Sequence, residues 1–259
     1  MRSEIQKELR HALRSGRFII LLVGFLFFAL LTPVMLKIVL PQVLASQTSR
    51  ELSAEISNMM NMTQIGCIQS YMGDVFEIGT IIIAFTLCGL TALEIRENRW
   101  VLPLCAGKQF GPMLGAKLLV FGAALITIPI IALLADYSYS GILFGFEVGV
   151  MPVLYGGLLQ GIYMLFLLAC LIMWGVLMKK PVPAGFMTLA TAFGIHFSSS
   201  LLKIYEWTPS GLLAHANMLT PSLDLTLFVP LGITIVLIVL MMLIALLRLK
   251  RMEWNTRNI

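Results

Sequence analysis

The sequence predicts an all-α integral membrane protein with six transmembrane helices. Of its 259 residues, 59% are hydrophobic and 12% are charged, whereas a soluble domain carries about 25% charged residues. The apolar residues gather into six long runs, and about 20 apolar residues are enough for a helix to cross a bilayer. We therefore expect one transmembrane domain over residues 1–259, with helices at residues 18–36, 73–93, 113–135, 151–178, 182–202 and 225–247.

The positions of the basic residues orient these helices. All but three of the 18 Lys and Arg residues flank the apolar runs on one side, and the exceptions are Lys37, Arg50 and Lys203. Because Lys and Arg accumulate in cytoplasmic loops, both termini are predicted to be cytoplasmic, in agreement with an even number of crossings. The net charge of +5 is scattered over helix ends and forms no patch, which argues against a nucleic-acid partner.

The N-terminal residues 1–17 are predicted to form an amphipathic helix in the membrane interface. Such helices place apolar residues on one face and Lys or Arg on another. A charged anchor for the first transmembrane helix is the alternative interpretation. The apolar residues Ile5, Leu9 and Leu13 recur at a spacing of four. The basic residues Lys7, Arg10 and Arg14 fall on other faces of the helix.

The largest outer segment, residues 37–72, is predicted to contain one helix. Pro41 is expected to end the first transmembrane helix, and apolar residues then recur at helical spacing between Val43 and Met60. A shorter interfacial helix is expected near "WTPSGLLAH", because Pro209 suits the first position of a helix. The loops 136–150 and 203–224 are expected to hold half-buried turns.

Ionisable side chains inside the apolar runs are rare, although such residues mark functional sites in membrane proteins. His196 precedes Ser198, Ser199 and Ser200, which indicates either an intramembrane enzyme or a neutral packing histidine. Asp74 and Glu77 lie at the outer end of the second run. They indicate either a cation or proton site or a solvated helix end. No His/Cys cluster of metal-binding type occurs, since the cysteines are isolated at Cys67, Cys88, Cys105 and Cys170.

Residues 92–117, between the second and third runs, are too polar to cross a membrane and too apolar for a solvated loop. Helix-breaking residues predict an elbow of short pieces, and they are Pro103, Gly107, Gly111 and Pro112. We expect Glu94 and Glu97 near the start of a short helix, where carboxylates meet the positive end of the dipole. Arg96 and Arg99 are expected to pair with acids of a soluble partner, and Trp100 and Leu104 to form an exposed anchor on one face.

No phosphate-binding loop accompanies this elbow. The stretch "AGKQ" contains a Gly-Lys pair, but Lys108 is followed by Gln109 where a Walker A motif has Ser or Thr. The chain is therefore not expected to bind ATP itself.

In its span count and cytoplasmic elbow the chain resembles the permease subunits of type-2 ABC exporters, over essentially its whole length. The matching features are the basic helix "EIQKELRHALRSGRF", the proline in "LPQVLASQ", the charged cluster after the second span, Lys117 at the start of the third and, loosely, "WTPSGLL". Two family elements differ: Asn98-Arg99 stands near the usual Gly-Thr, and "GKQF" replaces Pro-x-Ser-Arg, with Lys108 in place of the arginine.

The resemblance implies a non-catalytic transport subunit of a bacterial-type cell membrane. Its elbow would dock on a separate ATPase subunit that holds ATP and Mg²⁺, and the permease would pair with a second copy or a homologue. The substrate is expected to be hydrophobic or amphipathic. The coupling residues would be Glu94, Arg96, Glu97, Arg99, Trp100, Leu104 and Lys108.

Three alternatives remain open: an intramembrane enzyme that uses His196, an ion-coupled carrier that uses Asp74 or Glu77, and an interfacial re-entrant elbow with no partner.

Overall fold

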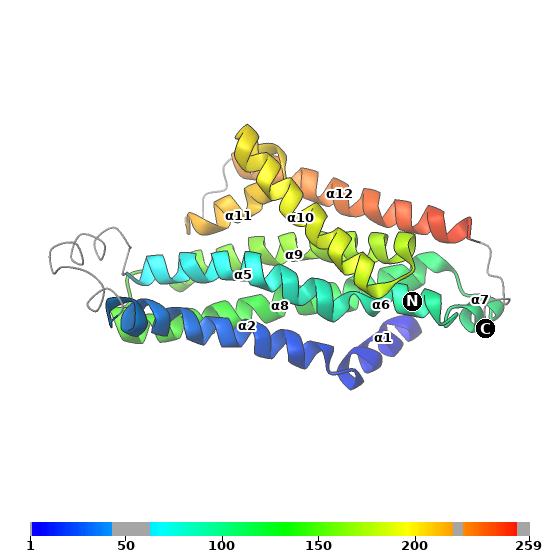
Figure 1. The fold of residues 1–259 in the computed structure, drawn as a ribbon, viewed down its shortest axis with the longest axis horizontal. Helices are drawn as coiled ribbons and strands as arrows, with labels where there is room; N and C mark the ends of the chain where they lie inside the picture. Colours follow the sequence, from blue (N-terminus) through cyan, green and yellow to red (C-terminus); the bar gives the residue numbers. More distant parts are fainter. Residues whose placement is uncertain (1, 43–62, 220–224, 253–259) are drawn as a thin grey trace.

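The computed structural model describes residues 2–42, 63–219 and 225–252 as an elongated bundle of helices (Figure 1), with no strand among these residues. The described α-helices carry the labels α1, α2 and α5 to α12, and a π-helix, η1, and a 3₁₀-helix, η2, accompany them. Their bounds are α1 Arg2–Arg14, α2 Arg17–Val34, η1 Met35–Val39, α5 Gln64–Leu87, α6 Gly89–Arg96, α7 Val101–Cys105, α8 Phe110–Phe144, α9 Val150–Met178, α10 Pro181–Leu202, η2 Tyr205–Trp207, α11 Ser210–Asn217 and α12 Leu225–Lys250.

Among the described residues, six helical stretches are long and apolar enough to cross a membrane, in agreement with the predicted number. Their mean hydropathy ranges from 1.2 to 3.0 over the best window of each. The stretches are Arg17–Gln42, Gln64–Arg96, Phe110–Phe144, Val150–Met178, Pro181–Leu202 and Thr226–Lys250.

The second and third of these helices extend well beyond the predicted apolar runs. The second begins at Gln64 rather than Gly73, because the Thr63 hydroxyl caps it by accepting the Gly66 N–H at 3.2 Å. The third runs to Phe144 rather than Ala135. The predicted loop that opens at Asp136 is therefore wrong in its first half, since the polar stretch "DYSYS" stays helical.

The first membrane-crossing helix is described through Pro41 to Gln42, so the break predicted at this proline lies at the edge of the described residues. The π-helical turn η1 ends at Val39, two residues before the proline. A π-turn widens the helix locally, and here it precedes a residue that has no N–H to donate. The Lys37 ammonium in this turn donates to the Leu143 carbonyl and lies over the Phe144 ring. Most of the predicted outer helix lies outside the described residues.

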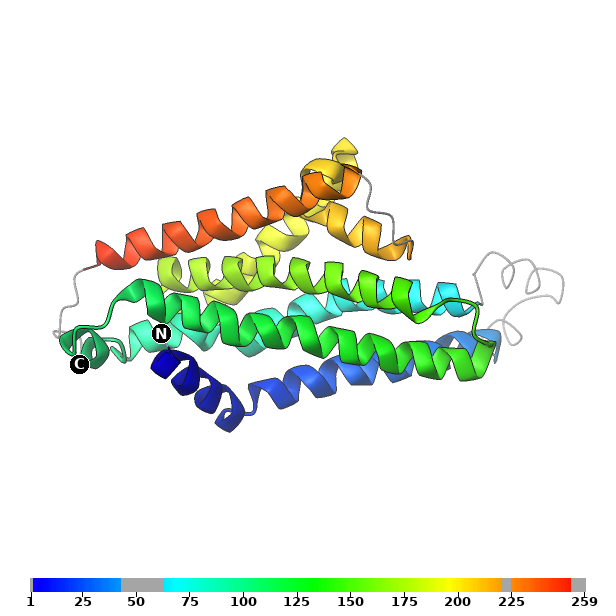
Figure 2. The same ribbon diagram turned by 180° about the vertical axis from the view of Figure 1, so that it is seen from behind.

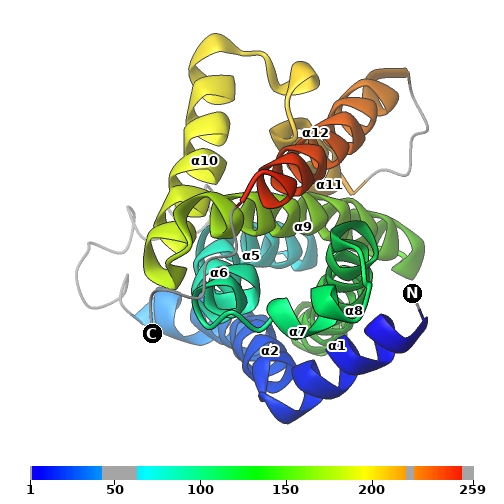
Figure 3. The ribbon, with the colours of Figure 1, turned by 90° about the vertical axis from the view of Figure 1, so that its right-hand side faces the viewer.

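Helix α9 is the central element of the bundle. Figure 3 shows it between α10 and α12 on one side and α2, α5 and α8 on the other, and 67% of its most apolar window is buried. Gly157 and Gly161, at a spacing of four, let α8 approach it closely. A Cβ on Gly161 would lie only 3.1 Å from the Ile126 Cα atom.

One end of the bundle, here called the α7 end, gathers the beginning of α1, helix α7 and the end of α12 (Figures 1 and 2). The opposite end holds the start of α5 and the end of α8. The short helix α11 follows Pro209 directly, so the predicted helix start is confirmed to within one residue.

Candidate functional site

The connection from α6 to α8 is built from two helix caps of the same type. After α6, the Asn98 N–H bonds to the Ile95 carbonyl at 3.2 Å and the Arg99 N–H bonds to the Glu94 carbonyl at 2.9 Å. This is the Schellman arrangement, which requires a left-handed residue at its centre. Asn98 takes that role with φ 51°, a conformation that asparagine adopts more readily than most residues.

The second cap ends α7 in the same way. The Gly107 N–H bonds to the Leu104 carbonyl at 2.9 Å, and the Lys108 N–H bonds to the Pro103 carbonyl at 3.0 Å. Gly107 has φ 78°, which is why a glycine stands here. The two caps reverse the chain within a few residues and fix α7 as a defined short helix between α6 and α8.

The acidic residues of this connection lie at the end of a helix, and the prediction that they begin one is wrong. Glu94 occupies the last turn of α6 and Glu97 is its C-cap. A carboxylate there faces the negative end of the helix dipole. A buried Glu94 therefore needs a cation, and the sequence supplies one on α8.

That cation is Lys117, whose side chain is 1% exposed. Its ammonium lies 2.9 Å from both carboxylate oxygens of Glu8, on α1, and 2.9 Å from the Glu94 carboxylate. Three helices that are distant in the sequence thus meet at one buried charge cluster, made of Glu8, Glu94 and Lys117. Because removing one partner of a buried pair leaves an uncompensated charge, the cluster fixes α1, α6 and α8 relative to one another.

Trp100 completes the cluster, and its predicted exposure is wrong. The indole is fully buried, and its Nε1–H donates to the Glu94 carboxylate. The ring packs near Phe110, with centroids 6.0 Å apart. Trp100 therefore anchors the connection to the bundle from within, and Leu104 is half-buried beside it.

A second ion pair joins α1 to the connection, between Glu4 and Lys108. The hydrogen bond from Lys108 holds the pKa of the Glu4 carboxyl below its ordinary value, against the opposing effect of burial. Glu4 and Glu8 are one helical turn apart on α1 and both are buried. The face of α1 that packs on the bundle is thus its acidic face.

The other faces of α1 are exposed. Leu9 and Leu13 are 43% and 61% exposed, which fits the predicted interfacial helix. Lys7, Arg10 and Arg14 are also exposed, and with His11 and Ser15 they line a surface cavity of about 530 Å³. Burial, and then the nearby Arg17, lower the pKa of His11 below its ordinary value.

The solvent-facing side of the connection includes several charged residues and the leucine of α7. Arg96, Glu97 and Arg99 are exposed, and the Arg99 guanidinium lies 2.6 Å from the Glu97 carboxylate. Leu102 on α7 is 81% exposed.

The structure does not bring the intramembrane serines to the imidazole of His196. The Ser199 hydroxyl donates to the backbone carbonyl of His196 at 2.8 Å, which is an ordinary helical contact. The imidazole stacks on Phe76 with ring centroids 4.4 Å apart, and its Nδ1 has no hydrogen-bond partner. Nothing in this geometry prepares a nucleophile.

A second polar cluster lies at the opposite end of the bundle. Asp136 is fully buried, and one carboxylate oxygen lies 3.8 Å from the Cys67 sulfur while the other has no partner. Asp74 is half-buried and accepts a hydrogen bond from Thr32 at 2.9 Å. Glu77, which was grouped with Asp74 as an ion-site candidate, is exposed.

Three residues of the α7 end were not identified from the sequence as parts of a site. Lys117 was predicted only as the residue at the start of the third span, and neither Glu8 nor Leu102 was assigned a role. A detectable pattern existed for Glu8. Glu4 and Glu8, the only acids of α1, are four residues apart and therefore lie on the same face of the helix.

No group of His, Cys, Asp or Glu able to hold a metal ion occurs among the described residues. Comparisons of the chain with protein-family models, with curated proteins and with solved structures give no match.

Proposed function

We propose that this chain is the permease subunit of an ATP-driven exporter of the type-2 ABC class. It would carry a hydrophobic or amphipathic substrate across a bacterial-type cell membrane, with both termini in the cytoplasm. A separate ATPase subunit would hold ATP and Mg²⁺, and a second permease copy or homologue would complete the transport path. The Lys and Arg distribution supports the orientation.

The observation that carries the proposal is the buried cluster of Glu8, Glu94, Lys117 and Trp100 behind an exposed short helix. A partner that pushes on α7 would meet a connection that is braced on α1, α6 and α8 at once. Displacement would then pass to the membrane helices, because packed elements move as rigid bodies rather than deforming continuously. An interfacial re-entrant elbow with no partner has no need of such a brace.

The outward residues of the connection define the expected contact surface. They are Arg96, Glu97, Arg99 and Leu102, with Lys108 at its edge, where Glu4 already engages the ammonium. Trp100 and Glu94 contribute by holding this surface in place.

The test is the stimulation of ATP hydrolysis in proteoliposomes that contain the chain and its partner ATPase. Leu102→Asp places a charge at the centre of the contact and is expected to abolish most of the stimulation, because a desolvated unpaired charge is costly in an interface. Leu202→Asp is the matched control, since Leu202 is 67% exposed at the far end of α10. Normal stimulation by Leu102→Asp, with the variant properly folded, would exclude α7 as the docking element.

An ion-coupled carrier is the second candidate, and the buried Asp136 favours it. A fully buried carboxylate with an unpartnered oxygen in a membrane helix is a typical ion or proton site. Transport into vesicles that is driven by an ion gradient without ATP, and is lost in Asp136→Asn, would support this candidate over the exporter.

A further inference from the structure

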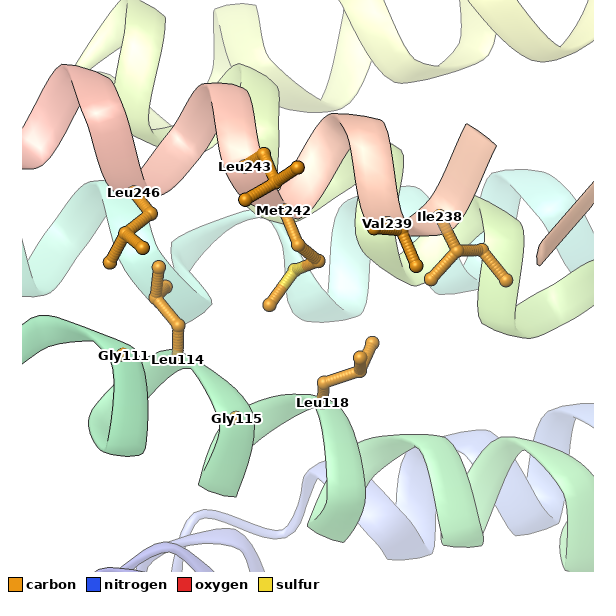
Figure 4. A pocket seen from close by; sticks show the side chains of 9 residues that line it. All are labelled: Gly111, Leu114, Gly115, Leu118, Ile238, Val239, Met242, Leu243 and Leu246. Atoms are coloured by element: carbon orange, nitrogen blue, oxygen red, sulfur yellow. The ribbon is translucent and has the colours of Figure 1, made fainter. Parts of the chain in front are cut away.

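An apolar groove runs between α8 and α12 near the α7 end. It has a volume of about 260 Å³ and is lined on α8 by Gly111, Leu114, Gly115 and Leu118. Figure 4 shows these residues facing a row of side chains from α12, which are Ile238, Val239, Met242, Leu243 and Leu246. The two glycines leave the α8 side of the groove without side chains at one end. Both helices that line the groove are long and apolar enough to cross the membrane. Its occupant is therefore expected to come from the bilayer.

The groove is elongated along α12. The lining residues Ile238 to Leu246 span about 12 Å along α12 at the rise of an α-helix. An apolar slot of this length, with a volume of about 260 Å³, has room for part of one extended hydrocarbon chain.

The end of the groove at the α7 end is positively charged. Ile238, Met242 and Leu246 follow one another at a spacing of four, and the next position of this stripe is Lys250. Its side chain is exposed, and among the described residues none forms an ion pair with it. Arg248 and Arg251 are exposed beside it.

The beginning of α8 adds to this positive charge. Helix α8 starts beside Gly111, and its N-cap residue Gln109 makes no side-chain hydrogen bond to the helix. The first-turn N–H groups and the positive end of the dipole of a 35-residue helix therefore lie at the mouth of the groove. The lysines at the start of α8 are engaged elsewhere, Lys108 by Glu4 and Lys117 by Glu8 and Glu94.

We propose that this groove is a binding site for an anionic phospholipid of the leaflet on the α7 side. One acyl chain lies between α8 and α12, and the phosphate-bearing headgroup lies at Lys250 and the start of α8. An apolar slot at membrane depth, with cations at its polar mouth, matches both parts of such a lipid. The site does not depend on the partner ATPase, so its test is independent of the exporter proposal.

The test uses photoactivatable lipids in vesicles that contain the full chain. A phosphatidylglycerol analogue with a diazirine midway along one acyl chain is compared with the matching phosphatidylcholine analogue. Illumination is followed by peptide mapping of the adducts. We expect the anionic probe to label the segments around Leu118 and Met242 several times more than the zwitterionic probe does.

Two variants locate the acyl chain and the headgroup. Gly111→Leu fills the groove, because a Cβ at Gly111 meets no atom within 4 Å, and it is expected to reduce labelling of both segments severalfold. Its control is Gly232→Leu on α12, where a Cβ also meets nothing within 4 Å and which does not line the groove. Lys250→Gln is expected to lower the preference for the anionic probe about fivefold, whereas Lys180→Gln, an exposed lysine before α10, leaves it unchanged.

Each result decides the proposal. Labelling that survives Gly111→Leu, with Gly232→Leu giving the same pattern, would show that the adducts come from general lipid contact and would overturn it. Equal labelling by both probes, or no effect of Lys250→Gln, would overturn the headgroup assignment. Because Lys250 is exposed at a helix end, that variant is expected to fold even if Gly111→Leu does not.

Discussion

At the scale of single residues, Lys117 has the largest predicted effect. Lys117→Met would leave Glu8 and Glu94 buried around an uncharged side chain. We expect a loss of about 3–5 kcal/mol in the free energy of unfolding, which is typical for removal of one partner from a buried pair. Lys180→Met, at an exposed lysine, is the control and should be neutral in a thermal unfolding assay in mild detergent.

The neighbouring pair Glu4 and Lys108 gives a pH-dependent prediction. The pKa of Glu4 is lower in the folded chain than its ordinary value of 4.5, so the folded state favours the charged carboxylate. The stabilisation is fully present above pH 4.5 and disappears as the pH falls through the lower folded-state pKa. Glu4→Gln should therefore lower the melting temperature at pH 7, and the difference from the unmodified chain should vanish in acid. A difference that persists unchanged in acid would contradict the assignment.

Substitution of the buried Asp136 is predicted to raise the melting temperature rather than lower it. Asp136→Asn removes a charge that has no partner on one oxygen while keeping a side chain of the same shape. Since an unpaired buried charge destabilises the folded state, we expect a higher melting temperature. Asp74→Asn, at a half-buried residue that accepts the Thr32 hydroxyl, should not raise it. A lower melting temperature for Asp136→Asn would show that the carboxylate forms a contact that stabilises the fold.

At the scale of elements, the connection between α6 and α8 depends on the backbone of two residues. Gly107→Ala forces a side chain into the left-handed region at φ 78° and is expected to cost about 1 kcal/mol. Gly111→Ala, four residues later inside α8 with open space around its Cβ, should be neutral or stabilising. Equal effects of the two substitutions on the melting temperature would contradict the Schellman assignment.

The elements also show which features could be predicted from residue patterns. The apolar runs predicted the six membrane-crossing helices of the described residues, because a helix needs about 20 apolar residues to cross a bilayer. Helix ends were predicted less well: Gln64 and Phe144 extend their helices through polar stretches that a cap and buried contacts stabilise. Such contacts depend on neighbours in space, and a single sequence does not contain them.

Trp100 illustrates the same limit for the site. Its spacing from Leu104 placed the two on one face, but spacing does not say whether that face meets solvent or the bundle. The side of α7 that is exposed was decided by Glu94 and Lys117, whose contact bridges 23 positions of the chain. The surface that remains outside is Leu102 with its charged neighbours.

At the scale of the whole molecule, the α7 end combines three features. Helix α1, the exposed short helix α7 and the end of α12 all lie at this end of the bundle (Figures 1 and 2). The buried charge cluster ties the first two together. The central claim is that a separate ATP-hydrolysing subunit docks on α7.

The most direct test of that claim uses Cys105, which is exposed in α7, whereas Cys67 and Cys170 are buried and Cys88 is half-buried. A short thiol-to-amine crosslinker applied to membranes should join Cys105 to a chain that carries a Walker A motif and hydrolyses ATP, and Cys105→Ser should abolish the adduct. If Cys105 reacts fully with the reagent while transport continues and no ATP-hydrolysing chain is captured, α7 is not the docking element.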